Sequence, residues 1–354
     1  MRDKKARKFF IQEHLLRGQL FHGGIGNVQI EEILLKAGYL PIHFPSEFDF
    51  SWKAKMRRTF YLFKILFLLP GDSTIVFQWP LHARLQVWLV KLLKQLRPSM
   101  HLICFLTDIN GLRDNDSQLL QKEVKFFKKA DSFIVHNLKM QEWLLRYHPE
   151  AKVAILEFFD FLADYNLGYR KKELSVSYAG NLDKARFVCQ LESLPQIKFY
   201  LYGLPAISDN FKIGNVEYLG SVEPKLLPQF IKGAFGLVWD GDSLIDLQGA
   251  YGEYMRINSP HKVSLYVLAG LPIIAPHDAG VSSLITQYNI GFTVASMLEI
   301  KEAIDTISDE QYQKMRTNCL TLASIISKGG CLLNALAQLE IMRSSGQSVR
   351  NDAG

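Results

Sequence analysis

Residues 257–275 are the most informative stretch of the chain, and they read Ile-Asn-Ser-Pro-His-Lys-Val-Ser-Leu-Tyr-Val-Leu-Ala-Gly-Leu-Pro-Ile-Ile-Ala. Ser259 suits the N-cap of a helix and Pro260 suits its first position, so we expect a helix over 260–269. A glycine and a proline follow and end that helix. Residues 273–275 then predict a short buried strand.

Lys262 falls in the first turn of this expected helix, where the helix dipole disfavours a cation. A lysine beside free backbone N–H groups is favourable if an anion binds there, and phosphate is the usual anion at such a corner. The stretch therefore predicts a nucleotide-diphosphate site.

Outward from this corner, short apolar runs alternate with helical patterns along the whole chain. The predicted strands are 9–15, 39–44, 74–79, 101–107, 132–136 and 153–156, then 175–178, 198–202, 217–219, 235–239, 272–275 and 291–294. The alternation predicts an α/β protein with two doubly wound, Rossmann-like halves, whose ligands bind at the carboxyl ends of the strands. We expect domains at 1–165 and 166–328, with a C-terminal helix and tail at 329–354.

Composition limits the classes of function. The chain has 354 residues, 48% hydrophobic and 21% charged, with a net charge of +6, which fits a globular protein that meets an anionic ligand or surface. Its four cysteines lack CxxC spacing, so we expect free thiols and no zinc site. No run reaches the roughly 18 apolar residues of a spanning helix. We expect a cytoplasmic protein, either soluble or peripheral at the membrane.

Two loops of the first half carry candidate substrate groups. Gly23, Gly24 and Gly26 follow the first predicted strand, and they would let a phosphate or sugar approach the backbone, unless they form only a flexible loop. Asp108 follows another strand and could act as a base, with Arg113 nearby. Turn capping is the alternative role for Asp108.

His136 ends a further strand of the first half. It could act as a base or contact substrate, or it could be a structural histidine satisfied by backbone groups.

In the second half, Gly180 and Asn181 predict a tight turn that can hold an anion, with Lys184 adding charge. A simple turn is the alternative. Tyr202 ends the next strand and could lie over a nucleobase or belong to the core. Asp240 and Asp242 resemble a metal pair, but aspartates in such loops more often cap turns, and we predict no metal. Residues 249–254, which follow, are expected to form an ordered loop.

Residues 51–64 place five basic side chains among aromatic residues on a predicted helix. The pattern suits a helix lying on a membrane surface, or a core helix with a basic solvated face.

Taken together, the motifs resemble a bacterial glycosyltransferase family with the GT-B fold. This family includes the glucosyltransferases that modify streptococcal serine-rich adhesins and β-1,6-galactofuranosyltransferases. The resemblance is strongest over about 175–300, and its motifs are Gly180-Asn181-Leu182, Tyr202-Gly203, 236–241, 251–254 and Asn258-x-Pro260-His261-Lys262-x-Ser264.

The resemblance implies transfer of a hexose, galactofuranose or glucose, from a UDP-sugar to a glycan acceptor of a cell-surface polysaccharide or glycoprotein. The implied donor-binding residues are Gly180, Asn181, Lys184, Tyr202, Asn258, Lys262 and Ser264. The acceptor would enter near 23–26, Asp108 and Arg113. The last helix, 330–344, would cross back to the first domain.

The chain departs from the family of retaining GT-B enzymes at one place. Those enzymes carry a Glu-x7-Glu pair, but here Ile257 and Leu265 occupy the corresponding positions. An inverting displacement is therefore expected, with Asp108 as the first candidate base and His136 as the second. No cofactor or metal is required if lysine and helix N-termini stabilise the leaving diphosphate.

Two other functions remain open on the sequence alone. One is a GT-B-fold nucleotide-sugar epimerase, and the other is a non-catalytic partner subunit of another transferase. We expect no nucleic-acid partner, and we leave open a homo-oligomer and a peripheral membrane contact.

Overall fold

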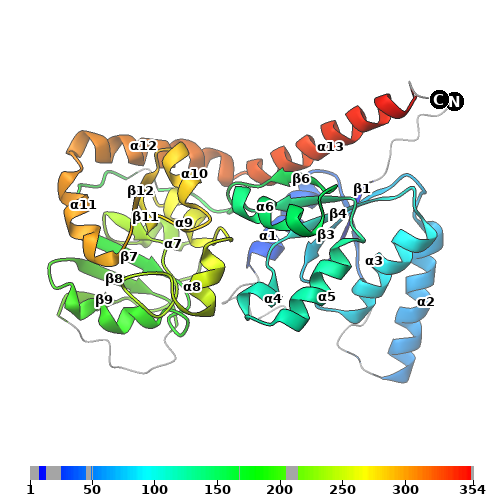
Figure 1. Ribbon diagram of the computed structural model, residues 1–354, viewed down its shortest axis with the longest axis horizontal. Coiled ribbons are helices and arrows are strands. Elements are labelled where there is room, and N and C mark those ends of the chain that lie inside the picture. The colour runs from blue at the N-terminus through cyan, green and yellow to red at the C-terminus, as the bar shows by residue number, and fades with distance from the viewer. Residues whose placement is uncertain are drawn as a thin grey trace.

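The chain folds into two α/β regions, each built on a sheet of six parallel strands (Figure 1). The computed structural model describes residues 8–12, 25–44, 49, 51–166, 168–204 and 214–351. The predicted fold class is confirmed, because helices follow the strands of both sheets as crossover connections.

The first sheet has the strand order β2-β1-β3-β4-β5-β6. Its strands are β1 Lys8–Ile11, β2 Leu40–Ile42, β3 Thr74–Trp79, β4 His101–Leu106, β5 Ser132–Val135 and β6 Lys152–Ile155. Its helices are α1 Ile25–Lys36, α2 Trp52–Leu68, α3 Arg84–Leu96, α4 Asn110–Arg113, α5 Ser117–Phe127 and α6 Leu138–Tyr147. The central strands β3 and β4 are buried on both faces, which explains their nearly continuous apolar runs.

The second sheet has the order β12-β11-β10-β7-β8-β9. Its strands are β7 Ser175–Ala179, β8 Lys198–Tyr202, β9 Val216–Tyr218, β10 Phe235–Leu237, β11 Ile273–Pro276 and β12 Gly291–Val294. Its helices are α7 Leu227–Phe230, α8 Gly249–Met255, α9 Lys262–Leu268, α10 Ser282–Gln287, α11 Ile300–Thr306 and α12 Asp309–Ile326, with 3₁₀ segments at Arg186–Ser193 and Met297–Glu299.

The last helix, α13 Gly330–Asn351, runs from the second region back along the first (Figure 1). It packs on β5 and β6, and the Lys152 ammonium donates to the Met342 carbonyl at 3.0 Å. At its start, the buried Asp160 carboxylate accepts the N–H groups of Cys331 and Leu332. The return of this helix to the first domain is as the resemblance implied.

Three local expectations need correction or fall outside the description. Strand β1 ends at Ile11, and residues 13–24, with Gly23 and Gly24, lie outside the described residues. Residues 249–254, read as a loop, belong to α8. Helix α9 starts at Lys262 rather than Pro260, and the Ser259 hydroxyl accepts a hydrogen bond from Asn137 instead of capping the helix.

None of the described helices is by itself long and apolar enough to cross a bilayer. Helices α12 and α13 pass that test of length and composition only as a pair, and the pair is bent by 64°.

Candidate functional site

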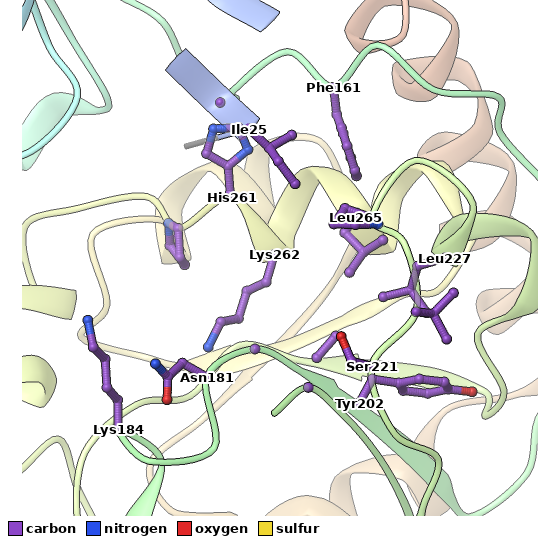
Figure 2. A pocket seen from close by; sticks show the side chains of 17 residues that line it. Ile25, Phe161, Asn181, Lys184, Tyr202, Ser221, Leu227, His261, Lys262 and Leu265 are labelled. Carbon is purple, nitrogen blue, oxygen red and sulfur yellow. The ribbon is translucent and has the colours of Figure 1, made fainter. Parts of the chain in front are cut away.

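A cavity of about 390 Å³ opens between the two regions, at the carboxyl edge of the second sheet (Figure 2). The start of α1 and the interdomain segment form one wall, and the ends of β7 and β8, the loop after β9 and the start of α9 form the other. Six predicted residues line it: Gly26, Gly180, Asn181, Lys184, Tyr202 and Lys262. The strand-end position is where open α/β sheets bind ligands.

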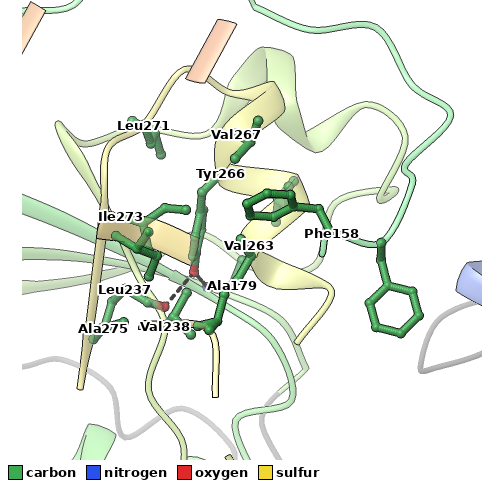
Figure 3. Close-up of a cluster of buried hydrophobic side chains, with 14 of the residues drawn as sticks. Phe158, Ala179, Leu237, Val238, Val263, Tyr266, Val267, Leu271, Ile273 and Ala275 are labelled. Carbon is green, nitrogen blue, oxygen red and sulfur yellow. Dashed lines mark hydrogen bonds between the residues drawn. The ribbon is translucent and has the colours of Figure 1, made fainter. Parts of the chain in front are cut away.

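Tyr266 fixes helix α9 against the sheet (Figure 3). Its hydroxyl accepts the Ala179 N–H at 2.9 Å and donates to the Leu237 carbonyl at 3.0 Å, so it links α9 to β7 and β10. A Cβ at Gly236 would lie 2.3 Å from the Tyr266 ring, and only glycine lets the ring lie flat there. This packing sets where the first residue of α9 points.

That first residue, Lys262, extends into the cavity wall with its side chain only 11% exposed. Its ammonium lies 2.7 Å from a carboxylate oxygen of Asp240, 3.2 Å from the Tyr178 hydroxyl and 3.2 Å from the Trp239 carbonyl. Tyr178 also donates to Asp240 at 3.0 Å. These three contacts hold the Lys262 ammonium in one place.

The turn after β7 faces Lys262 across the cavity (Figure 2). The Gly180 N–H bonds the Tyr202 carbonyl at 3.0 Å, and the Asn181 side chain accepts the Asp183 N–H at 2.9 Å, which closes a tight Asx turn. Gly203 has φ +139°, and a Cβ there would lie 1.9 Å from the Gly180 carbonyl oxygen. The ends of β7 and β8 therefore lie close together and form one continuous part of the cavity wall.

Lys184 lies at the open rim of the same turn. Its ammonium sits 4.7 Å from the centre of the Tyr251 ring, a cation–π contact that leaves the side chain largely exposed. A hydrogen bond from Arg113, with a smaller contribution from the Lys184 charge, lowers the pKa of Asp114. Lys184 on the second domain therefore lies within electrostatic reach of the Asp108–Asp114 loop of the first.

Tyr202 contributes the edge of its ring to the cavity, not its hydroxyl. The hydroxyl accepts the Lys232 N–H at 2.9 Å, and burial raises its pKa. Figure 2 shows this hydroxyl directed away from Lys262. The ring is available for apolar contact with a flat group.

His261 lines the cavity, and sequence reasoning did not select it. Its ring stacks on Phe159 with centroids 4.3 Å apart, and a Cβ at Gly26 would lie 2.2 Å from its Nε2. Burial lowers the pKa of His261 to about 4, so the ring is neutral at pH 7. Its place directly before Lys262 in the quoted motif was the one available signal.

Two predicted donor residues do not line the cavity. The Ser264 hydroxyl donates to the Phe159 carbonyl at 2.5 Å and is buried, so it fastens α9 to the interdomain segment. Asn258 lies in the segment between α8 and α9, and its side-chain oxygen is buried without a hydrogen-bond partner among the described residues.

Asp108 lies at the contact between the domains. It pairs with Arg113, and burial together with the nearby Asp108 carboxylate raises the pKa of Tyr254, whose hydroxyl accepts the Ile109 N–H at 2.9 Å. Tyr254 comes from α8 of the second domain, yet packs in the core of the first. The Asp108 side chain is 26% exposed, so solvent and a ligand can reach it.

His136 is only 2% exposed and does not line the cavity. Its Nδ1 accepts the Ser259 N–H at 3.2 Å, while the neighbouring Asn137 amide donates to the Ile257 carbonyl and the Ser259 hydroxyl, both at 2.9 Å. Burial lowers the pKa of His136 to about 4. The pair positions the segment that leads into α9, which is the structural alternative for this histidine.

No metal-binding arrangement is found in the part of the chain that the structure describes, where no group of three or more His, Cys, Asp or Glu side chains could hold an ion. Asp240, one of the two aspartates with the look of a metal pair, is instead the partner of Lys262.

Comparison with known proteins gives matches over both domains. The N-terminal domain model of the glucosyltransferase 3-like family matches residues 19–158, and its C-terminal domain model matches residues 176–339. The two models together cover most of the chain.

Named relatives agree with these matches. The β-1,6-galactofuranosyltransferase WbbI of Escherichia coli K12 is 31% identical over 59% of this chain and 63% of its own length. Glucosyltransferase 3 of Streptococcus gordonii is 26% identical over 64% of this chain and 67% of its own. The match to WbbI thus spans less than two thirds of that relative.

Among solved structures, Anabaena HepE in complex with UDP-glucose has a TM-score of 0.57 at 14% identity. The match covers 96% of this chain and 99% of HepE. This similarity supports the two-domain fold.

Proposed function

This chain belongs to the glucosyltransferase 3-like family, and from that premise we propose that it transfers a hexose, galactofuranose or glucose, from a UDP-sugar to a glycan acceptor. The observation that carries the proposal is the placement of Lys262 in the cavity wall, opposite the Gly180-Asn181 turn. A buried ammonium and a glycine turn that lets a ligand approach the backbone closely suit a diphosphate.

The donor would lie along the cavity with its diphosphate between Lys262 and the turn. The apolar part of the cavity, which Tyr202, Val222 and Leu227 line, suits the uridine. The sugar would then extend toward the first domain, where Gly26 and His261 close the cavity. HepE, which shares this fold, was solved with UDP-glucose bound.

We assign the acceptor side of the reaction to the first domain, with Asp108 as the base. Its carboxylate is partly exposed and lies on the loop that faces Lys184. In an inverting displacement, this carboxylate would take the proton of the acceptor hydroxyl as that oxygen attacks the anomeric carbon. The UDP leaves with its new charge stabilised by Lys262, so the step requires no metal or cofactor.

The test is a panel of UDP-sugars assayed for UDP release with the full chain, without and with glycan acceptors. The expected result is slow UDP release from UDP-galactofuranose or UDP-glucose, accelerated by acceptor. An isomerised UDP-sugar formed without acceptor would indicate an epimerase instead. No turnover of any donor, together with full function of a Lys262→Ala/Asp108→Asn protein in cells, would indicate a non-catalytic subunit.

A further inference from the structure

Helix α2 carries a continuous apolar stripe on its outer face. Its large side chains are mostly exposed: Trp52 73%, Met56 52%, Phe60 72%, Phe63 50% and Phe67 80%. Their spacing of three and four residues puts all five within an arc of about 80° around the helix. Apolar side chains of this size are seldom left in water in such a row, so the stripe indicates a surface that is covered in use.

The opposite face of α2 holds the helix in the fold. The Ser51 hydroxyl accepts the Ala54 N–H at 3.3 Å and caps the helix, and Leu62, Ile65 and Leu66 are buried in the core of the first domain. The stripe is therefore presented by a fixed helix rather than by a frayed segment. Figure 1 shows α2 at the outer edge of the first domain, on the side away from the second.

Basic side chains border the stripe on both sides. Lys53, Arg57 and Lys64 follow it on one side of the helix, Lys55 lies on the other, and α2 contains no acidic residue. Lysine and arginine beside aromatic residues can reach phosphate groups while the rings enter the apolar layer beneath them. From this combination we propose that α2 docks the protein on an anionic lipid surface, lying in the plane of the interface.

Charge favours a lipid surface over a second copy of the chain. A symmetric dimer through this face would bring the same basic borders of two α2 helices together, with no acidic residue on either helix to pair with them. An anionic headgroup layer supplies the complementary charge. The 17-residue helix also carries five basic residues, which suits the interface rather than a spanning position.

The test is sedimentation of the full chain with vesicles, using neutral phosphatidylcholine and vesicles that contain phosphatidylglycerol. We expect binding to the anionic vesicles only. Trp52→Ala/Phe60→Ala/Phe67→Ala should weaken it by at least about tenfold, since each ring adds apolar area. The matched control removes three exposed apolar side chains of the second domain, Tyr169, Phe230 and Ile245, and should bind normally.

A second pair of variants distinguishes the effect of the basic residues beside the stripe from the effect of the protein's net charge. Lys53→Glu/Lys55→Glu/Lys64→Glu should abolish binding at about 0.15 M salt, where long-range attraction is screened. The same charge reversal at the exposed lysines 171, 314 and 328 should leave most of the vesicle binding intact.

Three results would overturn the proposal. One is failure of the unaltered chain to bind anionic vesicles, and another is equal binding by the stripe variant and its control. The third is a dimer in light scattering that the stripe variant converts to a monomer, because the stripe would then be an interface between copies. Thermal unfolding checks that every variant is folded, and exposed positions on α2 should leave the melting temperature nearly unchanged.

Discussion

Lys262 meets the cavity with its charge already balanced by Asp240, and this pairing defines the site at the level of single residues. A buried ammonium without a partner would be costly, and the Asp240 carboxylate is the partner that holds the lysine in place. In the proposed reaction, a diphosphate would add a second anionic partner on the open side. The protein would then position the lysine, and the donor would complete its set of partners.

Histidine titration gives a prediction at the same scale. The pKa of His136 is lowered to about 4, below its usual range, so the unfolded chain binds more protons than the folded one between about pH 6.5 and 4. The stability that this histidine provides is present above pH 6.5 and is lost as the pH falls. His136→Asn keeps an acceptor for the Ser259 N–H and should reduce the pH slope of unfolding by up to about 1.4 kcal/mol per pH unit.

Denaturant unfolding of both proteins between pH 7 and 5 measures this slope. Asp160, whose pKa burial raises to about 7, acts in the opposite direction, and His261, whose pKa burial lowers to about 4, acts in the same direction. Both remain in both proteins, so the difference between the slopes comes chiefly from His136. Equal slopes for the two proteins would contradict a buried neutral imidazole.

Helix α9 and its strands set the site at the level of elements. Tyr266 joins the helix to two strands, and Gly236 leaves room for the ring. The site lies where β7 and β8 end and α9 begins, so a small shift of α9 moves Lys262 directly. Stability of this packing and affinity for the donor should therefore change together.

Tyr266→Phe tests that link. Loss of the hydroxyl leaves the buried Ala179 N–H without its partner, so the free energy of unfolding should fall by about 1–3 kcal/mol. Tyr251→Phe, which alters a partly exposed ring, should change it by less than about 0.5 kcal/mol. Chemical denaturation measures both, and equal small effects would show that the hydroxyl does not fasten the helix.

The sequence predicted the elements better than the contacts between them. Buried strands were recognisable because both faces are apolar, whereas α8 was read as a loop because of its two glycines. That helix depends on burying Tyr254 in the other domain, a long-range contact that no local pattern encodes. Ser259 was assigned to a cap for the same reason, since its actual partner, Asn137, is 122 residues away.

For the candidate site too, the sequence predicted the residues better than the contacts between them. The glycine turns at strand ends and Lys262 at a helix start were recognisable as motifs, and in the structure they line the same cavity. Asp240 was considered as a metal ligand or a turn cap but not as the partner of Lys262, because that pairing depends on how β10 and α9 pack. Ser264 was included by its place in the motif, but helical geometry turns it toward Phe159.

At the level of the whole molecule, the two domains are joined by more than the interdomain segment. Helix α13 returns to the first sheet, Tyr254 enters the core of the first domain, and Asn137 holds the backbone ahead of α9. These contacts fix the distance between the donor cavity and Asp108. A reaction between two substrates held on different domains depends on that distance.

Tyr254→Phe should lower the rate of transfer without weakening donor binding. It removes the hydroxyl that accepts the Ile109 N–H next to Asp108, but it leaves the cavity lining unchanged. We expect acceptor-dependent turnover to fall about tenfold or more while the Kd for UDP changes less than about twofold. Steady-state kinetics and calorimetry measure the two quantities, and a parallel loss of both would place Tyr254 in donor binding instead.

The central claim, that the cavity at Lys262 binds the donor diphosphate, is tested most directly by titration calorimetry with UDP. Three proteins are compared: the unaltered chain, Lys262→Ala, and Lys301→Ala, which removes an equal charge from an exposed pair with Asp305. We predict UDP binding that weakens at least about tenfold in Lys262→Ala and is unchanged in Lys301→Ala. Absence of UDP binding by the unaltered chain, or equal affinity in all three proteins, would contradict the account.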